Sequence, residues 1–170
     1  TEDNVADLQE AVGTRENPIA IPGICGIKIF MGVSTGTLLV SDKTALERIF
    51  TETAGLIAVH AEDEDRMAER RKLIEGRTDI AAHAYYRDDI TALMATKLSV
   101  ELAHKTGHRL HILHLTSGIE ADYLNDHCTL PSMADGYPII TTEVLPQHLT
   151  FDETDVDKHG VRLQMNPPIR

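Results

Sequence analysis

The distribution of apolar and polar positions along the 170 residues predicts alternating strands and helices. Short apolar runs closed by glycine or polar residues are typical of buried strands, and they occupy residues 25–32, 55–63, 108–117 and 136–146. Segments whose apolar residues recur three or four positions apart predict helices, over residues 3–12, 43–53, 64–76, 90–106 and 118–127. The remaining long stretches are expected to be an extended connection (77–89) and mostly loop (151–170).

Two helix ends carry specific expectations. Ser41 or Asp42 can cap the helix over 43–53, because their side-chain oxygens accept from free backbone N–H groups. Gly107 is expected to end the helix over 90–106, since glycine adopts the left-handed conformation that follows many helices.

The order of these elements indicates an α/β fold. Strands that alternate with helices pair in parallel, and helices cover the resulting sheet. A chain of 170 residues suffices for one domain with a sizeable core. Chemistry in such folds gathers at the carboxyl ends of the strands, so the residues found there are the first candidates for a site.

Composition narrows the possible partners. The formal net charge of −11 argues against a nucleic acid or an anionic membrane as partner, because both need a positive surface. No apolar run approaches the roughly 18 residues of a membrane span, and the acidic N-terminal stretch does not resemble a signal peptide. Two cysteines, Cys25 and Cys128, are too few for a disulfide framework, and they fit a reducing cytoplasm.

Each predicted strand carries a charged or metal-binding side chain near its carboxyl end. These are Lys28, His60, His114 and Glu143, with His148 following the last strand. Imidazole is a common ligand of zinc and related ions. The pattern therefore indicates a small-molecule or metal site at one edge of the sheet.

Structural roles remain open for the same residues. A lone strand-end histidine more often serves the fold, and the two together leave a metal site and a structural role equally open. Lys28 can extend along the surface or form half of a buried ion pair. The acids after His60 can simply favour a helix N-terminus. His111, at odd spacing from His114, is expected on the opposite face with a structural role.

Five blocks in order carry a resemblance to a known family. "GIKIFMGVSTG", "AVHAEDED", "RLHILHLTS", "TTEVLPQHLTFDE" and "MNPPIR" resemble the central blocks of dihydroorotase, of the cyclic amidohydrolase branch of the amidohydrolase superfamily. The "STG" and "NPPIR" stretches resemble dihydroorotase in particular. Leu145 and Gln147 depart from the Thr and His common there, and Gln147 is also similar to hydantoinases.

The resemblance implies a chemistry for particular residues. Lys28 is implied to react with CO2 and, as a carbamate, to bridge two divalent metal ions, usually zinc, with His60 and His114 as further ligands. Asn166 is implied to contact the substrate, and Glu143 and His148 to play supporting roles. The implied activity is the reversible hydrolysis of dihydroorotate to N-carbamoyl-aspartate in pyrimidine biosynthesis, by a cytoplasmic, metal-dependent hydrolase.

The resemblance also implies a fold larger than this chain. It places the four strands as strands four to seven of a (β/α)8 TIM barrel, with residues 1–170 as the central part of the domain, truncated at both ends. The sequence has no His-x-His pair, and the family's general-base aspartate is expected outside it, so the fragment alone is expected to be inactive.

Several alternatives stay open. One is another cyclic amidohydrolase, such as a hydantoinase, dihydropyrimidinase or allantoinase. Another is an inactive dihydroorotase-like structural partner, and a third is an incomplete gene product without independent function. The full-length parent is expected to be a homo-oligomer, and aspartate transcarbamoylase is a candidate partner.

Overall fold

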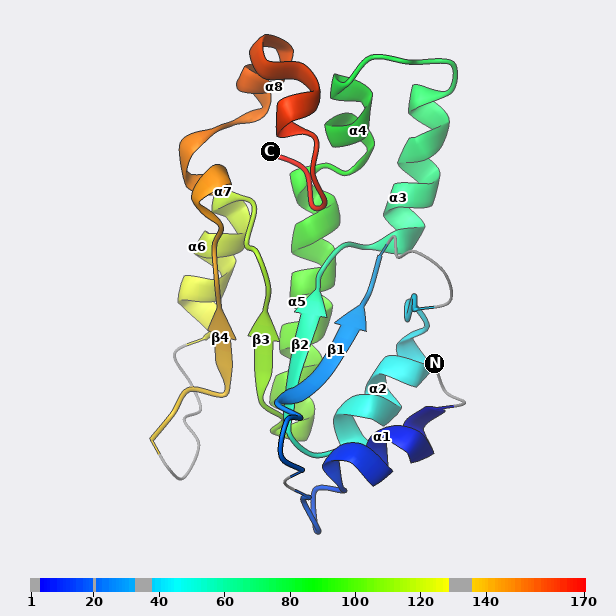
Figure 1. The fold of residues 1–170 in the computed structure, drawn as a ribbon, viewed down its shortest axis with the longest axis vertical. Coiled ribbons are helices and arrows are strands. Elements are labelled where there is room, and N and C mark those ends of the chain that lie inside the picture. The colour runs from blue at the N-terminus through cyan, green and yellow to red at the C-terminus, as the bar shows by residue number, and fades with distance from the viewer. Residues whose placement is uncertain (1–3, 20, 33–37, 129–135) are drawn as a thin grey trace.

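The protein is built on a four-stranded parallel sheet with the strand order β1-β2-β3-β4 (Figure 1). The computed structural model describes residues 4–19, 21–32, 38–128 and 136–170. The strands are β1 Gly26–Phe30, β2 Leu56–His60, β3 Leu110–Ile112 and β4 Ile140–Thr142. The expected α/β class with a parallel sheet is confirmed, and the "STG" stretch (34–36) lies outside the described residues.

Helices connect the strands and extend beyond them. They are α1 Val5–Val12, α2 Lys43–Glu52, α3 Glu64–Arg71, α4 Ala81–Tyr86, α5 Asp89–Thr106, α6 Gly118–His127, α7 Pro146–Thr150 and α8 Glu153–His159, with 3-10 turns η2 Lys72–Ile74 and η3 Gly160–Leu163. Both helix-end predictions are confirmed. Asp42 Oδ1 accepts from the Ala45 N–H at 2.8 Å, and Gly107 ends α5 with φ 63°.

Two predictions of irregular structure are wrong. The stretch 77–89 contains α4, whose first turn is held by Asp79, because its side chain accepts from the Ala82 N–H at 3.1 Å. The tail contains α8, which begins with a reciprocal capping box between Asp152 and Asp155. Both helices are short, so local capping rather than a long apolar stripe specifies them.

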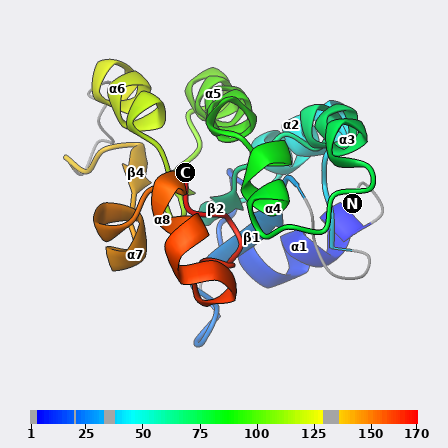
Figure 2. The same cartoon turned by 90° about the horizontal axis from the view of Figure 1, so that it is seen from above.

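The sheet has two different faces. Alternate positions of β1, β2 and β3 and the first position of β4 are buried, and these side chains are apolar: Ile27, Ile29, Ile57, Val59, Leu110, Ile112 and Ile140. Helices α5 and α2 contact each other, and α5 also contacts β3. Both helices lie on the same side of the sheet (Figure 2). The intervening positions Lys28, Ala58, His111 and Thr141 stand in one register row and are partly or fully exposed. The strands therefore do alternate, although their sequences contain few polar residues.

The carboxyl ends of the strands point toward α4 and α8, which lie beyond the sheet (Figure 1). Helices α4 and α8 contact each other. The last residues of the chain return to this edge, where Ile169 is buried and Arg170 donates to the Arg87 carbonyl at 2.7 Å. This edge therefore gathers residues from β2, α4, the loop after β3 and the chain's last segment.

Candidate metal and substrate site

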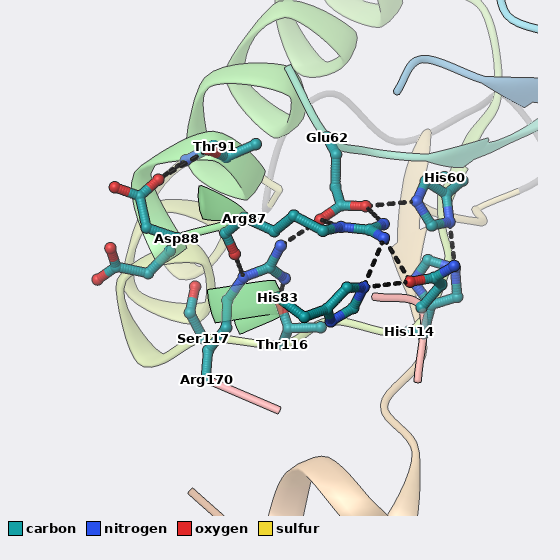
Figure 3. Close-up of polar contacts among 12 residues, drawn as sticks. His60, Glu62, His83, Arg87, Asp88, Thr91, His114, Thr116, Ser117 and Arg170 are labelled. Carbon is teal, nitrogen blue, oxygen red and sulfur yellow. Dashed lines mark hydrogen bonds and ion pairs between the residues drawn. The ribbon is translucent and has the colours of Figure 1, made fainter. Parts of the chain in front are cut away.

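The two strand-end histidines lie in contact at the carboxyl edge (Figure 3). His60 ends β2, and His114 follows β3 with a positive φ of 40°, a backbone conformation uncommon for a residue with a side chain. His60 Nδ1 is 3.1 Å from His114 Nε2. Burial and the neighbouring His60 lower the pKa of His114 to about 4, so its imidazole is neutral at pH 7. Sequence reasoning brought these two residues together correctly.

Lys28 stands on the exposed face of β1, within electrostatic reach of both His114 and Glu143. Its Nζ lies 4.5 Å from the centroid of the Phe30 ring. Partial burial lowers the pKa of Lys28 to about 8, against the opposing effect of the Glu143 charge. The amine is therefore neutral in a much larger fraction of molecules near neutral pH than an ordinary lysine amine.

A buried ion network lies directly behind His60. Glu62 is 1% exposed, and its carboxylate accepts from His60 Nε2 at 2.7 Å and from the guanidinium groups of Arg87 and Arg170 (Figure 3). Burial alone would raise the pKa of Glu62, but hydrogen bonds from His60 and Arg87 and the charge of Arg170 hold it below its ordinary value. The cluster thus keeps a charged carboxylate inside the protein.

Asn166 joins the same cluster from the chain's last segment. Its Oδ1 accepts from Arg87 and lies 3.0 Å from His83 Nε2. Arg87 is itself only 1% exposed, so it bridges Glu62 and Asn166 from the interior. The Arg87 guanidinium therefore connects Asn166 to Glu62, the carboxylate that contacts His60.

The prediction that His111 points to the face opposite His114 is wrong. His111 shares the register row of Lys28, and its Nε2 is 3.6 Å from Glu143, whose charge acts on Lys28. The odd-spacing argument failed because His114 lies beyond β3 with a left-handed backbone, where strand alternation no longer applies. His111 Nδ1 also contacts Thr141 Oγ1 at 2.8 Å.

The supporting candidates lie at the same edge. The His114 N–H donates weakly to Glu143 at 3.4 Å. His148 lies in α7 and lines a cleft of about 930 Å³ together with Thr116, Ser117 and Arg170. Lys28, His60 and His114 do not line that cleft. The candidate ligands therefore face a different region from this hollow.

The donor set fits part of a metal site. Two imidazole nitrogens converge, and a lysine amine of lowered pKa lies on the same sheet face. Within residues 4–19, 21–32, 38–128 and 136–170, no group of three or more His, Cys, Asp or Glu side chains is arranged to hold a metal ion. These residues can contribute ligands, and a complete site needs further donors.

Sequence reasoning missed most of the buried network. The sequence pattern indicates Glu62 only as an acid before a helix, and it indicates no role for Arg87, His83 and Arg170. Two indications were available: Glu62 follows His60 inside the strand-end run, and Arg170 closes the quoted "MNPPIR" block.

Comparison with known proteins places the whole chain beside cyclic amidohydrolases. The chain is 28% identical over 145 residues to a dihydroorotase of Methanosarcina mazei, covering 84% of this chain and 32% of that protein. It is 30% identical over 148 residues to a dihydroorotase of Halobacterium salinarum, covering 84% of this chain and 31% of that protein. An allantoinase of Bacillus velezensis is 28% identical over 159 residues, covering 90% of this chain and 34% of that protein. No protein-family profile matches the chain.

Solved structures agree with the sequence comparison. A dihydropyrimidinase from Brevibacillus agri superimposes with a TM-score of 0.75 at 26% identity, covering 98% of this chain and 34% of that one. A D-hydantoinase from Bacillus sp. AR9 gives a TM-score of 0.77 at 24% identity, covering 100% of this chain and 36% of that one. The chain thus spans about a third of the length of the relatives it matches. The expected resemblance to dihydroorotase and its cyclic amidohydrolase relatives is confirmed, and the chain has the fold of part of an amidohydrolase-type TIM barrel.

Proposed function

We propose that the protein is a metal-dependent cyclic amidohydrolase of the dihydroorotase type, and that residues 1–170 form the central part of its barrel domain. The observation that carries the proposal is the pair of imidazoles at the strand ends, His60 Nδ1 and His114 Nε2, 3.1 Å apart. Lys28 stands on the same sheet face. Sequence similarity to dihydroorotases over most of the chain supports the assignment.

Lys28 is proposed as the carbamylated ligand. Its lowered pKa leaves a useful fraction of neutral amine near neutral pH, and only that form attacks CO2. In the reaction the neutral amine forms a nitrogen–carbon bond to CO2 as one carbon–oxygen π bond opens, and one N–H proton leaves to solvent, which converts the amine into a carbamate anion. That anion, with His60 and His114, would hold the divalent metals, zinc being the expected ion. Bound there, the metals would supply Lewis-acid activation of a water molecule and of the substrate's amide carbonyl.

Asn166 is proposed to contact the substrate. Because its Oδ1 accepts from Arg87, its amide nitrogen is the group that would donate to a carbonyl of the ring. The proton-transferring aspartate is proposed to come from outside these 170 residues, so the piece alone is expected to lack turnover. In the full-length protein, homo-oligomerisation, association with aspartate transcarbamoylase and cytoplasmic location stay predictions. Among the described helices, none has the length and apolar character that crossing a membrane requires.

The test is hydrolysis by the full-length protein supplied with zinc and bicarbonate. We expect turnover of dihydroorotate, loss of activity in Lys28→Arg, and retention in Lys43→Arg, which alters an exposed lysine at the start of α2. A protein that binds zinc yet hydrolyses no cyclic amide would contradict the proposal.

A second candidate is an allantoinase or hydantoinase activity. It is favoured by the sequence similarity to an allantoinase and by the structural similarity to dihydropyrimidinase. Allantoin, hydantoin and dihydrouracil in parallel assays separate the candidates, since a preference for any of these over dihydroorotate would replace the first assignment.

A further inference from the structure

The carboxylate of Glu62 has every lone-pair direction occupied. One oxygen, Oε2, lies 2.7 Å from His60 Nε2 and accepts from Arg87. The other, Oε1, accepts from Arg87 Nε at 3.1 Å and from Arg170. Glu62 and Arg87 are each 1% exposed, so water does not compete for these contacts.

This arrangement determines which ring nitrogen of His60 carries the proton. A carboxylate that receives hydrogen bonds from two guanidinium groups has no proton to give, so it can only accept. The contact with His60 therefore requires a proton on Nε2. In a neutral imidazole the other nitrogen, Nδ1, then carries the lone pair, and it points at His114 Nε2 (Figure 3).

We propose that Glu62 is a positioning residue that fixes His60 in its Nε2–H tautomer and thereby selects Nδ1 as the nitrogen offered to a metal ion. The metal part of this inference rests on the proposed function, whereas the tautomer does not. Arg87 extends the arrangement, because the same guanidinium also donates to Asn166 Oδ1. Arg87 thus supports both the candidate ligand His60, through Glu62, and the candidate substrate contact Asn166.

Another buried carboxylate provides a matched control. Glu120 is 2% exposed and accepts from the hydroxyl groups of Thr96, Thr116 and Ser117. Its removal perturbs the same edge of the fold, but its hydrogen bonds reach no histidine ring. Glu62→Gln and Glu120→Gln therefore each replace a buried carboxyl group, and only the first touches His60.

The test is nitrogen-15 NMR of histidine ring nitrogens in the metal-free chain, with His60→Asn used to assign the signal. In the wild type we expect the proton of His60 on Nε2. In Glu62→Gln we expect a shift toward Nδ1–H, because an amide oxygen in the Oε1 position keeps the hydrogen bonds from Arg87 Nε and Arg170, and the amide NH2 in the Oε2 position then donates to His60 Nε2. Glu120→Gln should keep the wild-type tautomer.

A wild-type His60 with its proton on Nδ1 would overturn the proposal, and so would equal tautomer changes in both variants. If Glu62→Gln does not fold, the wild-type spectrum still decides. Zinc affinity of the full-length protein, measured by competition with a chelator, should fall by about 10- to 100-fold in Glu62→Gln and stay unchanged in Glu120→Gln. Measuring the tautomer needs neither metal nor substrate, so the result tests the role of Glu62 independently of the proposed enzymatic function.

Discussion

The helix-covered face of the sheet and the ion network at its carboxyl edge are equally buried but differ in chemistry. On the covered face, Ile57 and Val59 are fully buried among apolar side chains. At the edge, Glu62 and Arg87 reach the same depth as an ion pair. Apolar packing is non-directional and depends on filled volume, whereas a buried charge depends on each specific partner. The two regions should therefore respond very differently to substitution.

The largest expected loss of stability comes from a substitution at the carboxyl edge of the sheet. Arg87→Met keeps much of the side-chain volume but leaves the buried Glu62 with one guanidinium instead of two. We expect the free energy of unfolding to fall by about 3–5 kcal/mol, measured by urea denaturation. As a control, Arg77→Met removes an exposed ion pair with Asp79 and should leave the unfolding midpoint close to that of the wild type, because water screens the pair. Equal unfolding midpoints for the two variants would mean that the edge is no more sensitive than the surface.

On the helix-covered face, the free energy of unfolding should depend on the volume that side chains fill and not on specific partners. Ile57→Ala is expected to cost about 2–4 kcal/mol through lost burial and a cavity, while Ile57→Leu, which conserves volume, should cost less than about 1.5 kcal/mol. Thermal or urea unfolding of both variants measures the difference. If the leucine variant lost as much stability as the alanine variant, the distinction between the two regions would be wrong.

The smallest expected effect concerns the exposed face of the sheet, where the Lys28 amine should react faster than ordinary lysine amines. Since the pKa of Lys28 is lowered to about 8, its protonated form dominates below that pH and its neutral form above it. Ordinary lysines remain protonated until about pH 10.4. At pH 8 these pKa values give Lys28 a neutral fraction about a hundredfold larger than that of an ordinary lysine, so an acylating reagent should label it at least about tenfold faster than exposed lysines such as Lys43. Peptide mass spectrometry after brief labelling at pH 8 measures the ratio, and equal labelling would show that the amine is ordinary.

The comparison also explains what could be predicted from the sequence. The strands and the covered face follow from local runs of apolar residues, and the strand-end histidines follow from the rule that parallel strands end at one edge. The ion network does not, because it joins Glu62 to Arg87 across 25 positions and to Arg170 across 108. No local periodicity reports such pairings. His111 was misplaced for a related reason, since the positive φ of His114 interrupts the alternation on which the prediction relied.

The long separation between Glu62 and Arg170 has a consequence for synthesis on the ribosome. The first three strands can pair once β3 has emerged, because their contacts involve earlier parts of the chain. The ion pair of Glu62 with Arg170 can form only after the 108 residues that follow Glu62 have been translated. Non-local closure of this kind is slow relative to local pairing. The nascent chain therefore passes through a stage in which the sheet exists, the carboxylate beside His60 is incompletely paired, and the edge stays open to water.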